Sequence, residues 1–566
     1  MYILGVWDGH DAGAALLQDG KIIFASNEER YTRRKLEIKF PVNSVNAALR
    51  YAGIKPTDID TVAFPTTEFA KTMTRVFPYQ MEVYYKFRRR KLPLRPRLEW
   101  WMHMMKYGQT GIGVLPGCDG ISKIVVSKHL RSMGFKQFKL HAVDHHTSHA
   151  TGAAFTCGFD KALVITMDGL GDGLCGSIST LENGKLTRRS RIRARDSIGI
   201  FYEQVTNIVG MRELEDEGKV MAMADYSFPF KFEENKLRDL YAVNGTSIRA
   251  KYGAAAQYNF LSRIAWTMPR EQFAYMAQQL LENVLVQLVQ NAITEYGIGN
   301  IALSGGLFAN VKANMKVREL DAVKEWYVFP HMGDGGIALG AAMQVDYELN
   351  GTHSYPFDNA YLGDEFDDNA VETALKADPT LSYESDSDRM SHAAELINDD
   401  NYVFWYQGRM EYGPRALGDR SILAKSGSDD VKEKLNIYVK QREWYQPFAP
   451  SMLRSDADKL LESVKGYDRF MTMAYKAKDD KKALMQSVVH IDLTARPHMV
   501  GDENPNYRDL LTAVKKRTKY GIVLNTSFNI HGQPIVMSPQ DAIATMKKTK
   551  TKHMFLNDFY VENKEA

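Results

Sequence analysis

Apolar runs separated by Gly-rich turns occur in two stretches of the chain that resemble each other. The first stretch has a turn at 8–13 and an Asp-Gly pair at 19–20, and the second has a turn at 168–173 and an Asn-Gly pair at 183–184. Asp-Gly and Asn-Gly pairs between apolar runs are strong signals of β-hairpins. The repetition predicts a duplicated α/β domain.

Helical periodicity and further short apolar runs extend this pattern. Apolar spacing predicts helices near 42–51 and 271–296, and the run 300–303 predicts a strand before another Gly turn. A segment rich in Gly, Ser, Asn and Pro near 350–358 predicts a connection between domains. We therefore expect an α/β fold with two domains, covering 1–354 and 355–566, and an aromatic, basic insertion in the first domain at about 66–120.

Composition narrows the class of protein. The 566 residues are 44% hydrophobic, and 72 Lys and Arg nearly balance 69 Asp and Glu. These values exclude a disordered or collagen-like chain, and the absence of a long uncharged apolar run argues against a membrane span. The start of the chain lacks the pattern of a secretory signal, and three cysteines are too few for a disulfide framework. We expect a soluble, cytoplasmic protein without a membrane partner.

A candidate metal site lies in the sequence DHHTSHA. His145 and His149 are four residues apart, so a helix would place both imidazoles on one face. An isolated pair of this kind is more often solvated than metal-bound, and a carboxylate is needed to change that balance. Asp168 and Asp334, each beside a Gly-rich turn, are the candidates. Two His with one or two Asp suit Fe(II), Mn(II) or Zn(II).

Three Gly-rich turns that follow strands predict a nucleotide-binding region. DGHDAG, DGLGDG and SGGLFAN match neither the dinucleotide fingerprint nor the P-loop. Glycine turns beside acidic groups direct backbone N–H groups at phosphate, although any single one is usually an ordinary turn. The candidate nucleotide-binding residues of the first domain are Gly169, Gly171, Asp172, Glu217, Lys219, Gly305, Gly306 and Asn310.

The second domain contains a candidate anion site. The motif at 407–421 places three arginines among three glycines, and further cationic or hydrogen-bonding clusters occur at 440–443, 490–496 and 524–529. Arginines usually lie on a solvated face, but the tight turns and apolar neighbours here favour a lined pocket for phosphate or carboxylate. A chain with one metal and nucleotide site and one anion site is expected to be a two-step enzyme.

The insertion carries its own charge pattern. Arg88, Arg89, Arg90 and Lys91 are interleaved with tyrosines and followed by two tryptophans. This composition predicts a nucleic-acid groove, in which arginines meet phosphates and rings stack on bases. The alternative is an amphipathic helical insertion, with solvated arginines, that covers a small-molecule pocket or a dimer interface.

Several long motifs, in the same order, resemble the NodU/CmcH family of O-carbamoyltransferases over nearly the whole chain. The most specific are GRMEYGPRALGDRSILA from Gly408, HIDLTARP from His490 and NTSFNIHGQPIV from Asn525. HDAGAAL, EERYTRRK, HHTSHA and SGGLFAN support them. The resemblance implies an actin-like first domain, similar to the tRNA threonylcarbamoyladenosine transferase, and a YrdC-like second domain.

The resemblance also implies chemistry and roles. The second domain would make carbamoyl adenylate from carbamoyl phosphate and ATP, with Mg(II), and release pyrophosphate, and the first domain would transfer the carbamoyl group. His145, His149, Asp168 and Asp334 resemble the metal ligands, most often of iron in this family. His10 and Lys35 would lie near the carbamoyl group, with His10 accepting the proton of the acceptor hydroxyl. The residues that would bind carbamoyl phosphate and ATP are Arg415, Lys440, Arg442, Arg496, Ser527 and Asn529.

The acceptor remains open at this stage. A small glycoside or natural product and a hydroxymethylated pyrimidine in DNA, such as hydroxymethylcytosine, are both compatible with the sequence. Two other readings of the chain are a tRNA threonylcarbamoyl transferase and a non-catalytic actin-like regulator. The GRMEYGPRALGDRS motif argues against the first and the intact metal and anion residues against the second. The resemblance also implies a homodimer.

Overall fold

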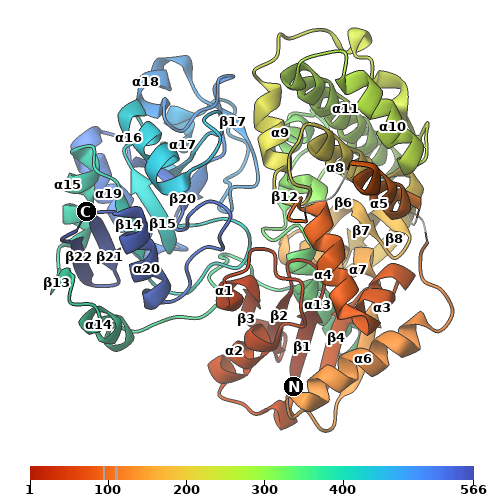
Figure 1. The fold of residues 1–566 in the computed structure, drawn as a ribbon, viewed down its shortest axis with the longest axis horizontal. Coiled ribbons are helices and arrows are strands. Elements are labelled where there is room, and N and C mark those ends of the chain that lie inside the picture. Colours follow the sequence, from red (N-terminus) through yellow and green to blue (C-terminus); the bar gives the residue numbers. More distant parts are fainter. Residues whose placement is uncertain (93–95, 109–111, 566) are drawn as a thin grey trace. The chain divides into compact units, whose positions relative to one another are not determined.

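A computed structural model describes residues 1–92, 96–108 and 112–565 (Figure 1). The chain divides into two compact units, and each contains both helices and strands. Unit 1 comprises Met1–Ala25 and Glu37–Pro356, and unit 2 comprises Ser26–Leu36 and Phe357–Ala566. The expected mixed α/β class is therefore confirmed.

The segment Ser26–Leu36 groups with unit 2, whereas the sequence analysis placed it in the first domain. Its arginines explain this grouping. The Arg30 side chain donates to the carbonyl oxygen of Gly413 (2.8 Å), and Arg33 donates to the carbonyl oxygen of Ile535 (2.6 Å). Partners so distant in sequence cannot be read from the local pattern.

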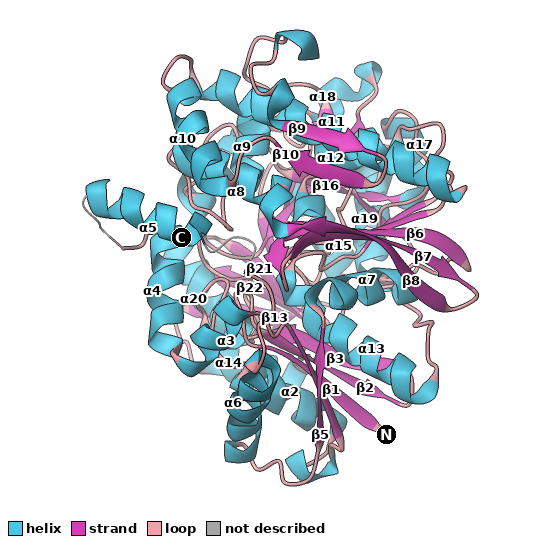
Figure 2. Cartoon of the chain, turned by 90° about the vertical axis from the view of Figure 1, so that its right-hand side faces the viewer, coloured by secondary structure: helices cyan, strands magenta, loops and turns pink. Residues whose placement is uncertain are grey.

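Within its described residues, unit 1 contains two five-stranded sheets with the same topology, which Figure 2 shows as separate groups of strands. Each sheet begins with an antiparallel hairpin, and the first strand of that hairpin pairs in parallel with the next strand along the chain. The expected duplication is confirmed by this shared topology. The first sheet has the order β3-β2-β1-β4-β5, with bounds Lys21–Asn27, Gly13–Gln18, Tyr2–Trp7, Thr61–Pro65 and Lys139–Val143. The second has the order β12-β11-β6-β7-β8, with bounds Trp326–Val328, Ile301–Ser304, Lys161–Gly171, Leu174–Glu182 and Lys185–Arg193.

Both expected hairpin turns are present, and their backbone angles explain the residues found there. Asp19 and Gly20 have φ of 47° and 74°, and Asn183 and Gly184 have φ of 52° and 74°. Two consecutive positive φ angles define the type I′ turn that fits the twist of a hairpin. The Gly-rich stretch at 168–173 differs from the prediction, because β6 continues through it to Gly171.

Two helices link the sheets of unit 1. α13 (Ile337–Asn350) packs on β1, β2 and β4, while α7 (His145–Thr156) packs on β6 and β11, and the two helices pack against each other. A Cβ atom at Gly340 of α13 would lie 1.9 Å from the carbonyl oxygen of Ser148 on α7. Glycine at this position therefore allows the close approach that brings the ends of the two sheets together.

The insertion is helical in its described part. α3 packs on α4 and α6, and α5 packs on α10, as Figure 1 shows. The bounds are Phe69–Val76 for α3, Pro78–Arg88 for α4, Pro96–Gly108 for α5 and Cys118–Ser132 for α6. Further helices of unit 1 are α8 (Ile198–Ile208), α9 (Glu217–Ala224), α10 (Ala254–Ala265), α11 (Arg270–Tyr296) and α12 (Val311–Arg318). The long helix expected at 271–296 is confirmed as α11.

Unit 2 is built on one mixed sheet with the order β13-β22-β21-β14-β15-β20-β16-β19. The strands have the bounds Leu381–Ser385, Phe559–Asn563, His553–Leu556, Val403–Tyr406, Arg420–Ala424, Ile522–Ser527, Ala449–Leu453 and His498–Val500. Its core packs α15 (Arg389–Asn398) and α19 (Pro505–Thr518) against the sheet through Val403, Trp405 and Leu511. Among the described residues, no helix is both long and apolar enough to cross a membrane.

Candidate functional site

Four side chains of unit 1 converge as the sequence analysis predicted for a metal site. The ligand atoms of His145, His149, Asp168 and Asp334 all lie within 4.8 Å of one another. His145 Nε2 is 3.1 Å from Asp168 Oδ2 and 3.6 Å from Asp334 Oδ1, and His149 Nε2 is 3.6 and 3.5 Å from the same two oxygens. Two imidazole nitrogens and two carboxylate oxygens at these separations form a compact ligand set.

Local backbone structure brings the two aspartates to this point. The pairing of β6 with β7 is interrupted between Met167 and Gly171, and Asp168 lies in this irregularity. Bulges of this kind redirect side chains and are common beside functional sites. The N–H of Gly306 donates to Asp168 Oδ1 (3.2 Å), while Asp334 begins the turn that leads into α13.

A second layer of hydroxyl groups orients both histidines. His145 Nδ1 is 2.9 Å from Thr66 Oγ1, and His149 Nδ1 is 3.3 Å from Ser304 Oγ. Such contacts direct Nε2 of each ring toward the carboxylates. His149 Nε2 is buried and has no hydrogen-bond partner in the described part of the chain. An unsatisfied nitrogen beside two carboxylates fits a divalent cation.

The pKa values of the cluster also favour a bound cation. Burial lowers the pKa of His145, but the carboxylates of Asp334 and Asp168 outweigh it and raise this pKa to about 10. Burial raises the pKa of Asp168, but hydrogen bonds and charge from the two histidines bring it well below its usual value. The two carboxylates therefore attract positive charge, which a metal ion would supply.

Replacing Thr66 by valine tests this orientation of His145. Valine keeps the shape of the side chain but removes the oxygen that contacts His145 Nδ1. Loss of an outer-shell partner of a metal-bound histidine costs about 10- to 100-fold in metal affinity. We expect a loss of this size when Fe(II), Mn(II) or Zn(II) is titrated against a competing chelator, and an unchanged affinity would contradict the assignment.

The two residues implied to act on the carbamoyl group lie in different units. His10, in the turn between β1 and β2, has its Nδ1 3.5 Å from Asp334 Oδ2, so it adjoins the candidate metal ligands. Lys35 belongs to the segment that groups with unit 2, where its charge acts on Lys440. The structure therefore associates Lys35 with the anion-site residues of unit 2.

The predicted nucleotide-binding residues of unit 1 divide into two groups. Asp172 accepts from the backbone N–H of His145 (2.8 Å), the first residue of α7, and from that of Thr67 (3.1 Å). Asn310 caps α12 and exchanges hydrogen bonds with Gln278. The side chains of these two residues are therefore already used inside the fold.

The other nucleotide candidates lie near the metal cluster or on α9. A Cβ atom at Gly171 would meet the His145 ring at 2.2 Å, and one at Gly306 would meet Asp168 Oδ1 at 2.9 Å. Gly305 has a φ of 104°, and Gly169 follows Asp168 directly. On α9, Lys219 pairs with Asp216 (3.0 Å), and burial raises the pKa of Glu217 to about 8.

In unit 2 the predicted Lys, Ser and Asn elements meet. Lys440 ends a π-helical segment, Leu435–Lys440, and is buried. Its Nζ donates to Asn529 Oδ1 (2.8 Å) and contacts Ser527, whose hydroxyl lies 2.7 Å from the same Oδ1. Burial, followed by the charges of Arg442 and Lys35, holds the pKa of Lys440 well below its usual value.

Arginines extend this cationic cluster. Burial and the charge of Arg496 lower the pKa of both Arg415 and Arg442. Arg415 Nε and Arg496 Nε are sealed from solvent and make no hydrogen bond within the described residues. The acid that acts on both is Asp468, whose carboxylate already accepts from the backbone N–H of Thr472 (2.7 Å). Like charges with unused donors are the arrangement expected of an anion site.

The three arginines of the 407–421 motif have different roles. Arg420 lies 3.6 Å from the centre of the Tyr406 ring and donates to backbone carbonyl groups, and Arg409 donates to the carbonyl oxygen of Leu362 (2.7 Å). Glu411 organises the loop by accepting from the backbone N–H groups of 417, 419 and 420. Arg415 is the arginine of this motif that contributes its charge to the anion cluster.

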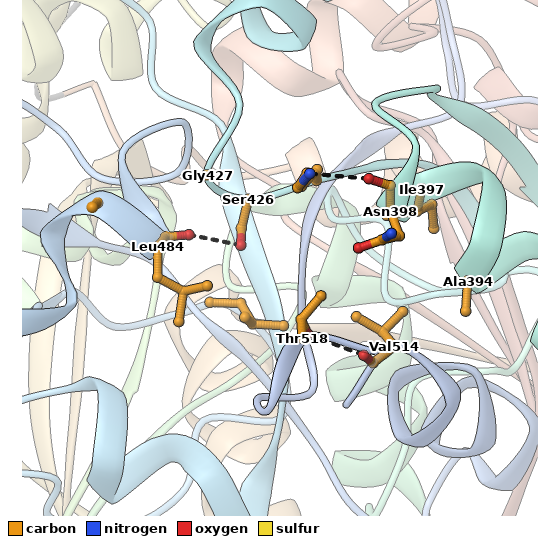
Figure 3. A pocket seen from close by; sticks show the side chains of 11 residues that line it. Ala394, Ile397, Asn398, Ser426, Gly427, Leu484, Val514 and Thr518 are labelled. Atoms are coloured by element: carbon orange, nitrogen blue, oxygen red, sulfur yellow. Dashed lines mark hydrogen bonds between the residues drawn. The ribbon is translucent and has the colours of Figure 1, made fainter. Parts of the chain in front are cut away.

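A cavity of about 200 Å³ in unit 2 lies apart from these residues (Figure 3). It is lined by apolar groups of α15 and α19, and none of the predicted site residues line it. Its polar groups bond within the protein, since Ser426 Oγ donates to the Leu484 carbonyl oxygen (2.9 Å) and Lys425 Nζ to that of Asn398 (3.0 Å). The cavity is therefore separate from the anion cluster.

Of the four cations predicted to contact nucleic acid, Arg88 and Arg89 are buried, whereas Arg90 and Lys91 are exposed. Arg88 is buried and pairs with Glu203 (2.5 Å) and Glu213 (3.0 Å). Lys91 pairs with Glu215 (2.8 Å), and Arg89 is buried 3.7 Å from the same residue. Arg90 donates to the carbonyl oxygen of Asn207 (2.7 Å). The solvated arginines of the alternative interpretation are also absent at Arg88 and Arg89, because acids distant in sequence pair with them.

Replacing Glu213 tests how much these ion pairs contribute to the free energy of unfolding. Glu213 is fully buried and contacts both Arg88 and Lys106. Replacing it by glutamine leaves Glu203 as the one carboxylate, among the described residues, paired with both buried cations, and the uncompensated charge costs about 3 kcal/mol of unfolding free energy. Urea unfolding should show this loss, whereas Glu182→Gln, which breaks an exposed pair with Lys161, should change the free energy of unfolding far less. Equal effects of the two changes would contradict the inferred role.

Sequence reasoning missed several residues around the site. Lys71 and Arg75 of α3 are buried and pair with Asp8 at 3.0 and 2.9 Å. Thr66 and Ser304 were not predicted to contact histidines, although Ser304 begins the SGGLFAN motif. SGGLFAN was the one sequence signal for any of these contacts. The contacts of Lys71, Arg75 and Thr66 depend on how the insertion packs.

Comparisons with known proteins complete this picture. Residues 2–343 match the family model described as carbamoyltransferase N-terminus, and residues 394–563 match carbamoyltransferase C-terminus. Nodulation protein NolNO of Sinorhizobium fredii is 31% identical, over 98% of this chain and 79% of that protein. An uncharacterized protein of Methanocaldococcus jannaschii is 34% identical, over 78% of this chain and 77% of its own length.

Among solved structures, HypF of T. kodakarensis aligns with 62% of this chain and 48% of its own, with 13% identity and a TM-score of 0.36. The N-terminal family model covers most of unit 1, and the C-terminal family model covers most of unit 2. The chain belongs to the carbamoyltransferase family.

Proposed function

We propose that this chain is an ATP-dependent O-carbamoyltransferase that makes carbamoyl adenylate in unit 2 and transfers the carbamoyl group to the hydroxyl of a small molecule in unit 1. The observation that carries the proposal is the presence of two different sites, one for each half of such a reaction. Unit 1 has a compact set of two histidines and two aspartates, and unit 2 has a cluster of cations with unused donors.

The cationic cluster suits the adenylation step. Carbamoyl phosphate and water give carbamate and phosphate, a carbamate oxygen then attacks the α-phosphorus of ATP, and pyrophosphate leaves. Arg415 and Arg496 would bind the phosphate groups through forked, charge-assisted hydrogen bonds, and Arg442, whose Nε donates to Asn436 Oδ1 (2.9 Å), would add its charge. Lys440, held by Ser527 and Asn529, would place a hydrogen-bond donor where negative charge develops. Mg(II) would accompany the ATP.

The cluster of unit 1 suits the transfer step. His145, His149, Asp168 and Asp334 would hold a divalent metal, which when bound supplies Lewis-acid stabilisation of the departing AMP phosphate. Iron is proposed from the family resemblance. His10 lies beside this cluster and would accept the proton of the acceptor hydroxyl as that oxygen attacks the carbamoyl carbon.

The acceptor is proposed to be a small hydroxylated molecule rather than DNA. The DNA hypothesis depended on the cations of the insertion, and the charges of three of them, Arg88, Arg89 and Lys91, are compensated by Glu203, Glu213 and Glu215. Phosphate binding requires cations whose donors face the polyanion. Compensated, buried arginines do not provide them.

Mass spectrometry tests the proposal directly. The protein is incubated with ATP, carbamoyl phosphate and Fe(II), together with either a panel of glycosides and amino sugars or DNA containing hydroxymethylpyrimidines. A gain of one carbamoyl group on a small molecule supports the proposal, and a gain on the DNA nucleosides alone overturns the proposed acceptor. If ATP and pyrophosphate do not exchange in the presence of carbamoyl phosphate, the adenylation step itself is contradicted.

A further inference from the structure

Helix α4 of the insertion places a tyrosine beside the candidate base. Tyr85 Oη is 3.1 Å from His10 Nδ1, and the two rings lie 5.5 Å apart. Tyr85 is half-buried, and the side chain of His10 is 21% exposed. The pair therefore lies at the boundary between the metal cluster and solvent, where an acceptor molecule can approach.

His10 Nδ1 faces two oxygen atoms. One belongs to Tyr85, and the other is Asp334 Oδ2 at 3.5 Å. A carboxylate oxygen can only accept a hydrogen bond, so this environment favours the tautomer of His10 with its proton on Nδ1. The phenol oxygen of Tyr85 can accept from the same N–H. Nε2 of His10 is then left with its lone pair.

The cations of the insertion fix the position of Tyr85. The Arg88 and Arg89 guanidinium groups lie 5.8 and 5.3 Å from the centre of its ring. Arg88 is in turn held by Glu203 and Glu213. Cations near a ring face are attracted to its electrons, and a guanidinium with two carboxylate partners cannot move freely. These charges thus form a rigid support for one side chain.

We propose that Tyr85 is a positioning residue that, together with Asp334, holds the His10 ring with its Nδ1 proton directed at their oxygens, and that α4 forms the acceptor side of the transfer site. The inference rests on the proposed function, since it takes His10 as the base of the transfer. It also gives the insertion a role that does not involve nucleic acid: the ion-paired arginines place a tyrosine in the site. The free O–H of Tyr85 would then be available to donate to an oxygen of the hydroxylated acceptor.

The test compares Tyr85→Phe with Tyr84→Phe. Tyr84 is the neighbour on the same helix, its ring lies 5.3 Å from that of Tyr85, and its hydroxyl makes no hydrogen bond among the described residues. We expect Tyr85→Phe to lower kcat for transfer by about tenfold or more, since an orienting contact to the base is lost. More ATP should be consumed for each carbamoylated product, because slower transfer leaves more time for water to hydrolyse the carbamoyl adenylate. ATP–pyrophosphate exchange and melting temperature should stay at the wild-type values, and Tyr84→Phe should behave as wild type.

A second measurement does not depend on turnover. In protein labelled with ¹⁵N-histidine, the His10 signals, assigned by their loss in His10→Gln, report which ring nitrogen carries the proton. We expect a protonated Nδ1 in the wild type and a changed Nδ1 signal in Tyr85→Phe but not in Tyr84→Phe. An unchanged His10 spectrum in Tyr85→Phe, or wild-type kcat and ATP consumption, overturns the inference. Failure of the wild type to modify any acceptor, with the His10 spectrum as expected, instead contradicts the proposed function alone.

Discussion

Replacing Arg415 by methionine should reduce carbamoyl-phosphate-dependent ATP–pyrophosphate exchange by about 10²- to 10³-fold, the cost of losing one preorganised donor to a developing anion. The same change should raise the melting temperature of the ligand-free protein. Burial and the nearby charge of Arg496 hold the pKa of Arg415 well below its usual value, so the folded protein is destabilised by keeping this group charged. Methionine retains apolar packing and removes that cost.

Arg420→Met is the matched control, because it changes the same residue type in the same motif. Arg420 is fully buried, stacks on Tyr406 and satisfies backbone carbonyl groups of the loop. Its replacement should lower the melting temperature, since these carbonyl groups lose their donor. Thermal unfolding with and without inorganic phosphate measures both effects. A lower melting temperature for ligand-free Arg415→Met, or an undiminished shift on adding phosphate, would contradict the anion-site assignment.

His149→Ala should separate the two halves of the reaction. Removing one of two imidazole ligands leaves a set that no longer matches the metal, so metal content should fall and transfer should decrease by about 10³-fold or more. ATP–pyrophosphate exchange should remain at the wild-type rate, because the residues proposed for adenylation all belong to unit 2. The expected result is therefore an enzyme that activates carbamate but does not deliver it.

The control for this variant comes from the same motif. His146 lies one residue after His145, but its Nδ1 is 2.9 Å from Thr166 Oγ1 and it is not one of the four clustered ligands. His146→Asn keeps a polar group at the position of Nδ1 and should retain metal and transfer. Elemental analysis of the purified variants, followed by both assays, checks the pair. Equal losses in the two variants, or a parallel loss of exchange in His149→Ala, would argue against separate sites.

Local sequence patterns predicted much of the fold. The Asp-Gly and Asn-Gly turns depend only on neighbouring residues that tolerate a positive φ, and both hairpins are present where they were expected. The pairing of His145 with His149 follows from the period of a helix, and the Gly turns indicated which carboxylates could join them. The long apolar period of α11 was likewise visible without tertiary information.

The extent of β6 was harder to predict. Three glycines between 168 and 173 read as a turn, yet pairing with β7 resumes at Gly171 after an irregularity. A bulge depends on the partner strand as well as on local sequence, so it carries Asp168 out of the regular ladder without a distinct sequence signal. The grouping of Ser26–Leu36 with unit 2 has the same origin, because its hydrogen-bond partners come from residues hundreds of positions away.

Motifs and local patterns in the sequence were enough to predict the family, the duplicated α/β pattern and the residue types of both sites. The role of each charge became visible in the folded chain: Arg420 is bound to carbonyl groups, Arg88 is paired with glutamates, and Arg415 lies beside the like charge of Arg496. The physical reason is that periodicity and turns are properties of neighbouring residues, whereas the fate of a charge depends on partners that folding brings from elsewhere in the chain. Arginine in a motif therefore predicts an anion site only after its internal partners are known.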